Sequence, residues 1–259
     1  MRRTKYWQLV LIGLVAGAIA TAVAIFVPWL PSPASRQAGR IEFVYWFATV
    51  MCLVIFSVVA AILVYSIINF RAQPGDWSDG PPVHGNTTLE VIWTLVPAVL
   101  VTSLAVVSAV VLTRNGSAGT NPLVVKVVAQ QFAWQFQYPN KKTYGILRLP
   151  VDRTVKLEIT ANDVIHSWWM KDFGVKKDAI PGFVNEAWFK VDKDKPGLYR
   201  GQCAELCGRD HGFMPIVVDA RPKEAFTAWL KAEAAAQKQA AAPAPEGAAP
   251  AAAPAAPAP

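Results

Sequence analysis

The fold class of this 259-residue chain is decided by residues Phe43–Phe70, which read FVYWFATVMCLVIFSVVAAILVYSIINF. The segment runs for 28 residues without a charged side chain. A helix that crosses a lipid bilayer needs about 20 consecutive apolar residues, so this segment is long enough to span one. The sequence therefore predicts a protein anchored in a lipid bilayer and excludes a wholly soluble enzyme.

Two further uncharged stretches flank this segment, Leu9–Val27 with 19 residues and Val91–Thr113 with 23. The second and third stretches (43–70 and 91–113) are joined by a polar segment rich in Pro and Gly, so residues 41–113 are predicted to form a transmembrane helical hairpin. The first stretch, within residues 1–34, is typical of a signal peptide, but it is longer than the usual apolar core of about 7–15 residues. A retained signal-anchor helix is therefore favoured, with a cleaved signal peptide as the alternative.

The orientation follows from the basic N-terminus, where Arg2, Arg3 and Lys5 precede the first apolar stretch. Positive charges favour the cytoplasmic side of a membrane. Three crossings then place Arg114 and everything after it outside, and removal of the first helix gives the same outcome. Because the N-terminus resembles a bacterial export signal, we expect a multi-pass protein of a bacterial plasma membrane.

Residues 114–221 differ in composition, since charged residues alternate there with β-branched and aromatic ones. Short runs of this kind, separated by turn residues, predict an all-β sandwich or barrel. The runs are Leu123–Ala129, Phe132–Tyr138, Gly145–Leu149, Thr154–Thr160, Ala187–Val191, Gly197–Gln202 and Met214–Asp219. Residues 222–239 predict a terminal helix, and residues 240–259, mostly Ala and Pro, predict a disordered tail. The formal charge of +7 is scattered along an anchored chain, so no nucleic-acid partner is expected.

One short segment concentrates metal-binding chemistry: Cys203-Ala-Glu-Leu-Cys207-Gly-Arg-Asp-His211-Gly-Phe-Met214, with a further histidine, His166, 37 residues before Cys203. Thiolate and thioether ligands suit copper, and imidazole suits copper or zinc. A mononuclear blue-copper site needs only one cysteine. The second cysteine therefore favours a pair of copper ions bridged by both sulfurs, each ion with one histidine.

Three other interpretations compete with this one. Outside the cell, Cys203 and Cys207 could form a disulfide. Two cysteines and two histidines could hold structural zinc, although zinc leaves Met214 without a role. His211 could be an ordinary surface histidine. The combined pattern favours the copper pair.

At this point the sequence resembles a known family, subunit II of the haem–copper terminal oxidases of the cytochrome c oxidase type. The resemblance covers about residues 41–221 and rests on several separate motifs. These are Thr88-Leu-Glu-Val-Ile-Trp93-Thr-Leu-Val-Pro97, His166-Ser-Trp168, Asp178-Ala-Ile-Pro-Gly182, Tyr199-Arg-Gly-Gln-Cys203-Ala-Glu-Leu-Cys207-Gly and His211-Gly-Phe-Met214-Pro215. The resemblance implies two transmembrane helices followed by an external cupredoxin-like Greek-key sandwich that holds the dicopper Cu-A centre.

The resemblance also implies roles for individual residues. It assigns His166 and Met214 to one copper, His211 and the Glu205 carbonyl to the other, and Cys203 and Cys207 to both. The Glu205 side chain matches a ligand to a Mg²⁺ shared with subunit I. Glu90 matches the mouth of a proton pathway into subunit I, although an acid in the first turn of a helix is also favoured by the helix dipole.

The residue through which electrons enter differs from the family pattern. The usual first tryptophan of the segment 130–134 is Phe132 here, and Trp134 matches the second. Trp168 or Trp169 is a candidate substitute at the docking surface. The alternative for all these aromatic side chains is a place in the sandwich core.

The function implied by the resemblance is transfer of single electrons from cytochrome c or a similar donor to haem in subunit I. Subunit I, with its haem and Cu-B, reduces O₂ to water with proton translocation, and subunits I and III are other chains. No Cys-x-x-Cys-His motif occurs, so no covalent haem is expected in this chain. The alternatives are a quinol-linked oxidase subunit, the Cu-A subunit of a nitric oxide reductase type enzyme and a membrane-anchored copper carrier.

The charge of the external part bears on the donor. Residues 114–224 contain 17 Lys and Arg against 12 Asp and Glu, a net charge of +5. Complementary charge steers encounters between proteins. We therefore expect an acidic or membrane-tethered donor, unless acids such as Asp163, Asp172 and Asp178 cluster locally.

Overall fold

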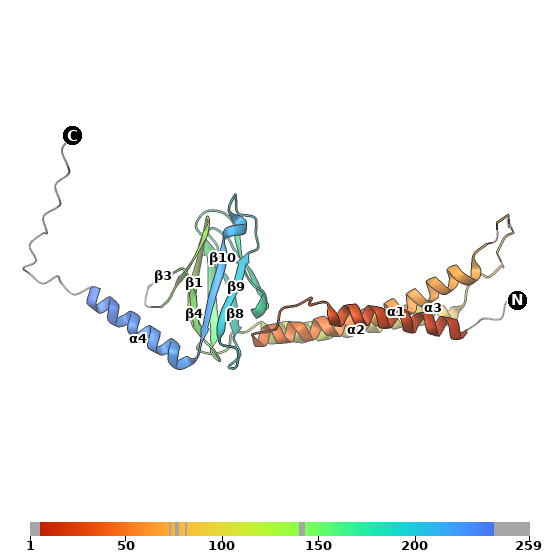
Figure 1. Ribbon diagram of the computed structural model, residues 1–259, viewed down its shortest axis with the longest axis horizontal. Helices are drawn as coiled ribbons and strands as arrows, with labels where there is room; N and C mark the ends of the chain where they lie inside the picture. Colours follow the sequence, from red (N-terminus) through yellow and green to blue (C-terminus); the bar gives the residue numbers. More distant parts are fainter. Residues whose placement is uncertain (1–5, 73, 76–77, 81, 140–142, 241–259) are drawn as a thin grey trace, which may run out of the picture.

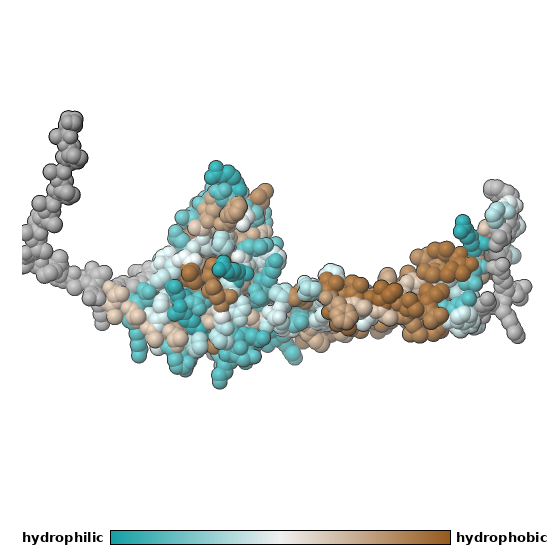
Figure 2. All heavy atoms as spheres, viewed as in Figure 1, coloured by the Kyte–Doolittle hydropathy of each residue, from teal (hydrophilic) through white to brown (hydrophobic). Residues whose placement is uncertain are grey.

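Three long helices form an extended limb, and a β-sandwich stands at one end of it (Figure 1). The computed structural model describes residues 6–72, 74–75, 78–80, 82–139 and 143–240. The basic residues before Tyr6 and the predicted tail from residue 241 onward lie outside the described residues. The limb is covered by apolar side chains over much of its length, whereas the surface of the sandwich is mainly hydrophilic (Figure 2).

The helices of the limb are α1 (Tyr6–Phe26), α2 (Arg36–Phe70) and α3 (Thr87–Asn115). All three are long and apolar enough to cross a membrane. Most of their large apolar side chains are exposed, as expected for helices whose surroundings are lipid rather than water. The expected fold, membrane helices followed by a β-sandwich, is confirmed.

Helix α2 begins seven residues before the apolar stretch, because its first turn is fastened to the sandwich. Ser35 caps the helix: its Oγ accepts a hydrogen bond from the Ala38 N–H (3.1 Å) and donates one to the Phe173 carbonyl (2.8 Å). The Ala34 N–H donates to the Asp172 carbonyl at 2.8 Å. A satisfied cap lets the polar first turns stay helical.

Helix α1 packs closely along α2 through small residues. A Cβ atom added at Gly17 would lie 2.8 Å from Ser57 Oγ, and one added at Gly13 would lie 3.3 Å from Ala61 Cβ. Close approach of backbones at small residues is the usual way in which helices associate within a membrane. The first helix is therefore fitted to its neighbour along the glycine face.

The sandwich consists of two five-stranded sheets, ordered β3-β2-β1-β5-β8 and β4-β10-β9-β6-β7. Most neighbouring strands are antiparallel, but β1 pairs with β5 and β4 pairs with β10 in parallel. Along β1 and β5 every second residue is buried, so the inner faces of the sheets form the core. The strands are β1 (Leu123–Gln130), β2 (Ala133–Gln137), β3 (Thr143–Tyr144), β4 (Leu147–Pro150), β5 (Thr154–Ala161), β6 (His166–Met170), β7 (Val175–Ala179), β8 (Asn185–Lys190), β9 (Gly197–Cys203) and β10 (Pro215–Arg221).

Strands β3, β6 and β7 were not among the predicted runs. Strand β6 is buried at four of its five positions, so it lacks the alternation that identifies a half-exposed strand. Strand β7 reads VKKDA, and its three consecutive charged residues lack the apolar pattern from which a strand is predicted. His166 is the first residue of β6.

Strands β6 and β9 approach each other unusually closely at Gly201. A Cβ atom added there would lie 2.3 Å from the Trp169 carbonyl oxygen and 2.9 Å from Met170 Cε. The two strands pair through Trp168 with Cys203 and Trp169 with Gln202. This close pairing fixes the position of Cys203 relative to the start of β6.

Helix α4 (Lys223–Ala240) follows the last strand and corresponds to the predicted terminal helix. Phe226 is buried, and the Trp229 ring lies edge-on to Tyr138 and Tyr144, with centroid distances of 5.5 Å and 5.3 Å. These contacts attach the first turns of α4 to the sandwich.

Candidate metal centre

The predicted ligands meet at one end of the sandwich, which we call the cysteine end. Hydrogen bonds and strand pairing bring its segments together: the β1–β2 turn, the start of β6, the segment after β7 and the β9–β10 loop. The segments are residues 129–134, 161–167, 178–184 and 203–214.

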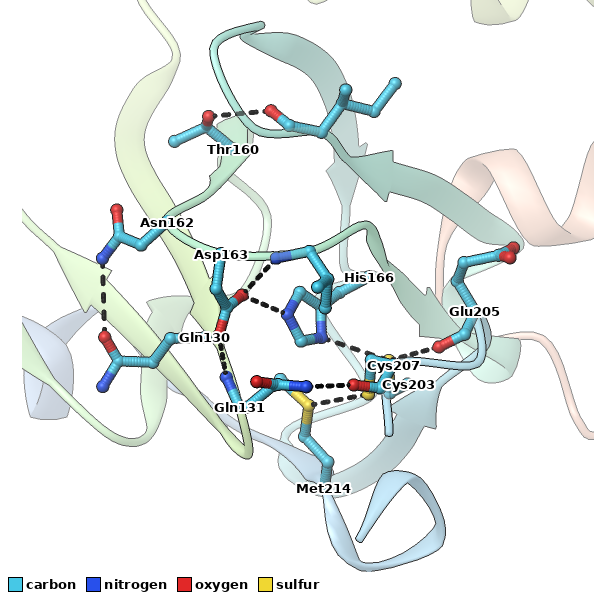
Figure 3. A network of polar contacts seen from close by, with 12 residues as sticks. Gln130, Gln131, Thr160, Asn162, Asp163, His166, Cys203, Glu205, Cys207 and Met214 are labelled. Carbon is cyan, nitrogen blue, oxygen red and sulfur yellow. Dashed lines mark hydrogen bonds and ion pairs between the residues drawn. The ribbon is translucent and has the colours of Figure 1, made fainter. Parts of the chain in front are cut away.

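The side chains of His166, Cys203 and Cys207 are buried, and their ligand atoms lie within 4.8 Å of one another. Cys203 and Cys207 are free cysteines, which argues against the disulfide alternative. Both thiols point into the same space, which the buried Met214 side chain closes from below in Figure 3.

Each cysteine sulfur has its own histidine. His166 Nδ1 lies 4.0 Å from Cys203 Sγ, and His211 Nδ1 lies 3.5 Å from Cys207 Sγ. Met214 Sδ lies 3.9 Å from Cys207 Sγ, and the Glu205 carbonyl oxygen lies 3.4 Å from Cys203 Sγ. Four donor atoms therefore surround the two sulfurs, which makes six donors in all, more than one four-coordinate metal ion needs.

The chemistry of these donors fits copper better than the hard cations Mg²⁺ and Ca²⁺, which prefer oxygen. Burial raises the pKa of the Cys207 thiol to about 11, and the neighbouring Cys203 acts in the same direction. Two thiolates side by side in a buried pocket need nearby positive charge. A soft cation bound between the sulfurs supplies that charge, so the donor set fits a copper pair.

Asp163 holds His166 in place, as Figure 3 shows. Its Oδ1 lies 2.9 Å from His166 Nε2 and accepts from the Val164 N–H at 2.7 Å, while Oδ2 accepts from the Gln131 N–H at 2.7 Å. Partial desolvation acts to raise the pKa of Asp163, but these hydrogen bonds together bring it below its usual value. Because an ionised carboxylate only accepts, His166 Nε2 carries the hydrogen and Nδ1 is free to bind a metal.

Gln131 braces the cysteine loop from the other side. Its side-chain amide donates to the Cys207 carbonyl at 2.6 Å. The next residue in the loop is Gly208, with a φ of +134°, and a Cβ there would lie 2.9 Å from Gln131 Nε2. The bracing roles of Asp163 and Gln131 were not recognised from the sequence, and the only available signal was the spacing of Asp163 three residues before His166.

Three of the candidate aromatic residues differ in how deeply they are buried. Phe132 is half-buried and lies against the backbone of Gly208, where its ring carbons would be 3.2 Å from an added Cβ. Trp134 is 4% exposed, with its ring centroid 6.1 Å from that of His166. Trp168 is 0% exposed and stacks on Phe189, so the expectation that it substitutes at the docking surface is wrong.

Glu205 points in two directions. Its backbone carbonyl faces Cys203, whereas its carboxylate extends away from the sulfur pair (Figure 3). The carboxylate is exposed. One residue can therefore offer an oxygen to the cysteine site and a second oxygen to an ion on its outer side.

Glu90 lies in the first turn of α3, at the end of the limb remote from the sandwich (Figure 1). Its Oε1 accepts from the Asn86 N–H at 3.2 Å, and the Asn86 side chain accepts from the Leu89 N–H at 3.1 Å. This reciprocal pattern is a helix cap. Capping explains why α3 begins four residues before its apolar stretch.

Charge is unevenly distributed over the sandwich. Among the described residues of the cysteine end, the only Lys or Arg is Arg209, which pairs with Asp210 at 3.3 Å. Asp172 lies at the far end of the β6–β7 hairpin, so the expected cluster of Asp163, Asp172 and Asp178 does not form as such. The acids of the cysteine end are Asp163, Asp178, Glu205 and Asp210.

Comparisons with known proteins identify both parts of the chain. Residues 18–111 match the family model for the transmembrane domain of cytochrome c oxidase subunit II, and residues 145–221 match the model for its periplasmic domain. A cytochrome c oxidase subunit 2 from Synechocystis sp. is 31% identical, over 88% of this chain and 84% of the relative. A probable cytochrome c oxidase subunit 2 from Rickettsia bellii is 32% identical, over 86% of this chain and 91% of the relative.

Among solved structures, the periplasmic domain of subunit II of cytochrome oxidase (CoxB) of Bradyrhizobium japonicum is similar. It is 34% identical, and the match covers 47% of this chain and 99% of that one, with a TM-score of 0.43.

Proposed function

The chain belongs to the cytochrome c oxidase subunit II family, and on this premise we propose that electrons from an external donor reach the haem of subunit I through its cysteine end. The observation that carries the proposal is that two imidazole nitrogens, one thioether sulfur and one carbonyl oxygen converge on the Cys203–Cys207 sulfur pair. The complex that contains such a subunit is an oxidoreductase.

The proposed cofactor is a pair of copper ions. Cys203 and Cys207 would be shared by both ions, His166 and Met214 would hold one of them, and His211 with the Glu205 carbonyl would hold the other. When bound, a copper pair supplies reversible one-electron redox chemistry. The chain contributes a buried and braced set of ligands, because Asp163 orients His166 and Gln131 fixes the cysteine loop. Partners of this kind fix the orientation of metal ligands.

Metal analysis and EPR spectroscopy of the purified full-length chain test this proposal. We expect two copper ions per chain and hyperfine splitting from one electron shared by both nuclei. One copper ion, zinc alone, or a Cys203–Cys207 disulfide under conditions that load copper would overturn it.

Three further roles belong to the same proposal. The exposed Glu205 carboxylate is a ligand to Mg²⁺ shared with subunit I. Glu90 serves a proton pathway into subunit I in addition to capping α3. Phe132, in contact with the cysteine loop and near the surface, is the residue through which electrons enter, with Trp134 behind it.

We also propose that the chain is a multi-pass protein of a bacterial plasma membrane, with the sandwich on the external side and subunits I and III as partners. Helix α1 remains in the mature subunit, because its glycine face fits Ser57 and Ala61 of α2. N-terminal sequencing of the purified oxidase tests this, and a first residue beyond Phe26 would contradict it.

Replacing Asp163 with asparagine is expected to lower copper affinity by about 10–100-fold, the usual effect of removing a partner of a metal ligand. The Asp163 carboxylate accepts hydrogen bonds from three groups, the Gln131 N–H, the Val164 N–H and His166 Nε2. In asparagine one carboxylate oxygen becomes an NH₂ group, which is a donor, so at least one of these hydrogen bonds is lost. Resistance of the copper to a competing chelator measures the effect. Asp172→Asn is the matched control, because it removes the same charge far from His166, and equal resistance in both variants would show that Asp163 does not position the histidine.

The local acids revise the expectation about the donor that was based on net charge. Steering depends on the field near the docking surface, and the cysteine end is acidic. We expect the rate constant for reduction by a basic cytochrome c to fall several-fold between ionic strengths of about 0.01 M and about 0.15 M, as the Debye length shrinks from about 30 Å to about 8 Å. Stopped-flow measurement on the intact oxidase checks this, and a flat or rising rate would restore the expectation of an acidic or membrane-tethered donor.

A further inference from the structure

Helices α2 and α3 enclose a groove of about 520 Å³ where they approach the sandwich. The groove lies on the outer half of the limb if the sandwich is external. Its main lining residues are Arg36, Arg40 and Phe43 from α2, and Val107, Val110 and Arg114 from α3.

Polar and apolar side chains are separated along the length of this groove. The helices are antiparallel, so Arg36 and Arg40 near the start of α2 lie beside Arg114 near the end of α3. The valines follow toward the middle of the membrane, and Val106 is about 12 Å from Arg114 along the helix axis. The groove is therefore cationic at its outer end and apolar along its depth.

The cationic end has a defined arrangement. Arg40 Nη1 donates to the Arg114 carbonyl and to Asn115 Oδ1, both at 3.0 Å, and so ties the two helices together. The carboxylates that interact electrostatically with Arg36 are Asp152 and Asp192 of the sandwich. In the part of the chain that the structure describes, no carboxylate lines the groove itself.

Three arginines on the external side of a membrane protein run against the usual bias of positive charge toward the cytoplasm. We propose that this groove binds an anionic phospholipid, with its phosphate among Arg36, Arg40 and Arg114 and one acyl chain along the valines of α3. Guanidinium groups match phosphate oxygens through paired hydrogen bonds. Basic pockets between transmembrane helices are typical sites for anionic lipid headgroups.

The test uses the intact oxidase, purified in detergent and supplied with phosphatidylglycerol or phosphatidylcholine. Native mass spectrometry then measures how much of each lipid stays bound to this subunit. We expect phosphatidylglycerol to be retained in preference to phosphatidylcholine, and the variant Arg36→Gln/Arg114→Gln to retain at least about tenfold less of it. Arg40 is left intact because it holds α2 and α3 together.

Two further variants separate the parts of the site. Arg153→Gln/Arg200→Gln removes two exposed arginines of the sandwich and should leave lipid retention unchanged. Val110→Phe fills the groove and should lower retention while all three arginines remain. Equal retention in the wild type and Arg36→Gln/Arg114→Gln would overturn the proposal. Displacement of the lipid by inorganic phosphate at low millimolar concentration, or loss of retention only when subunit I is removed, would also overturn it.

Discussion

Replacing Cys207 with serine is expected to remove the copper pair and to lower electron transfer into the oxidase by at least about 100-fold, the upper end of the effect of losing even a partner of a metal ligand. Cys207 Sγ lies 3.5 Å from His211 Nδ1 and 3.9 Å from Met214 Sδ, so it stands between both proposed copper positions. A serine hydroxyl is a hard and neutral donor, and copper prefers thiolate. Losing the shared sulfur affects both ions at once.

Cys52→Ser is the matched control for this prediction. Cys52 is the only other cysteine, and it lies within α2, away from the sandwich. Copper content, the EPR spectrum and oxygen consumption with cytochrome c are measured on the intact oxidase for both variants. Two copper ions with an unchanged spectrum in Cys207→Ser would refute the proposed ligand set.

The second large effect concerns stability rather than metal binding. Replacing Gly201 with alanine is expected to destabilise the sandwich by about 3 kcal/mol, near the upper end of the cost of overpacking. The new Cβ would lie 2.3 Å from a backbone oxygen of Trp169, which cannot move aside as a flexible side chain can. For a domain of about 100 residues this corresponds to a fall in Tm of at least about 10 °C.

Gly197→Ala supplies the comparison, because its Cβ would meet only the Tyr199 ring, at 3.9 Å, on the same strand. Thermal unfolding of the full-length chain in detergent, followed by tryptophan fluorescence, measures both variants. Similar Tm values for the two variants would show that β6 and β9 can move apart without loss of stability, contrary to the close pairing described above.

The sequence predicts the features that depend on local composition. The three apolar stretches identify the membrane helices, and the spacing of Cys203, Cys207, His211 and Met214 identifies the metal-binding loop. The attachment of the start of α2 to the sandwich was not predictable, because Ser35 Oγ donates to the Phe173 carbonyl, 138 residues away in sequence. Long-range contacts of this kind have no local signal.

Burial explains the other differences. Trp168 is of the residue type expected at a docking surface, but its ring stacks on Phe189 of the facing sheet and is therefore buried. Asp163 was considered only as a surface acid, because its contact with His166 depends on how the turn between β5 and β6 folds. In both cases the residue type was visible in the sequence and the neighbour was not.

The fastening of α2 to the sandwich has a consequence for the order in which the protein is made. Residues 34–37 leave the ribosome long before their partners, the Asp172 and Phe173 carbonyls and the Asp192 and Lys190 N–H groups. The first turn of α2 therefore lacks these hydrogen bonds until the later half of the chain has been translocated and folded. Insertion of the helices and folding of the sandwich are thus coupled steps of biogenesis, because the start of α2 gains its hydrogen bonds only when the sandwich has formed.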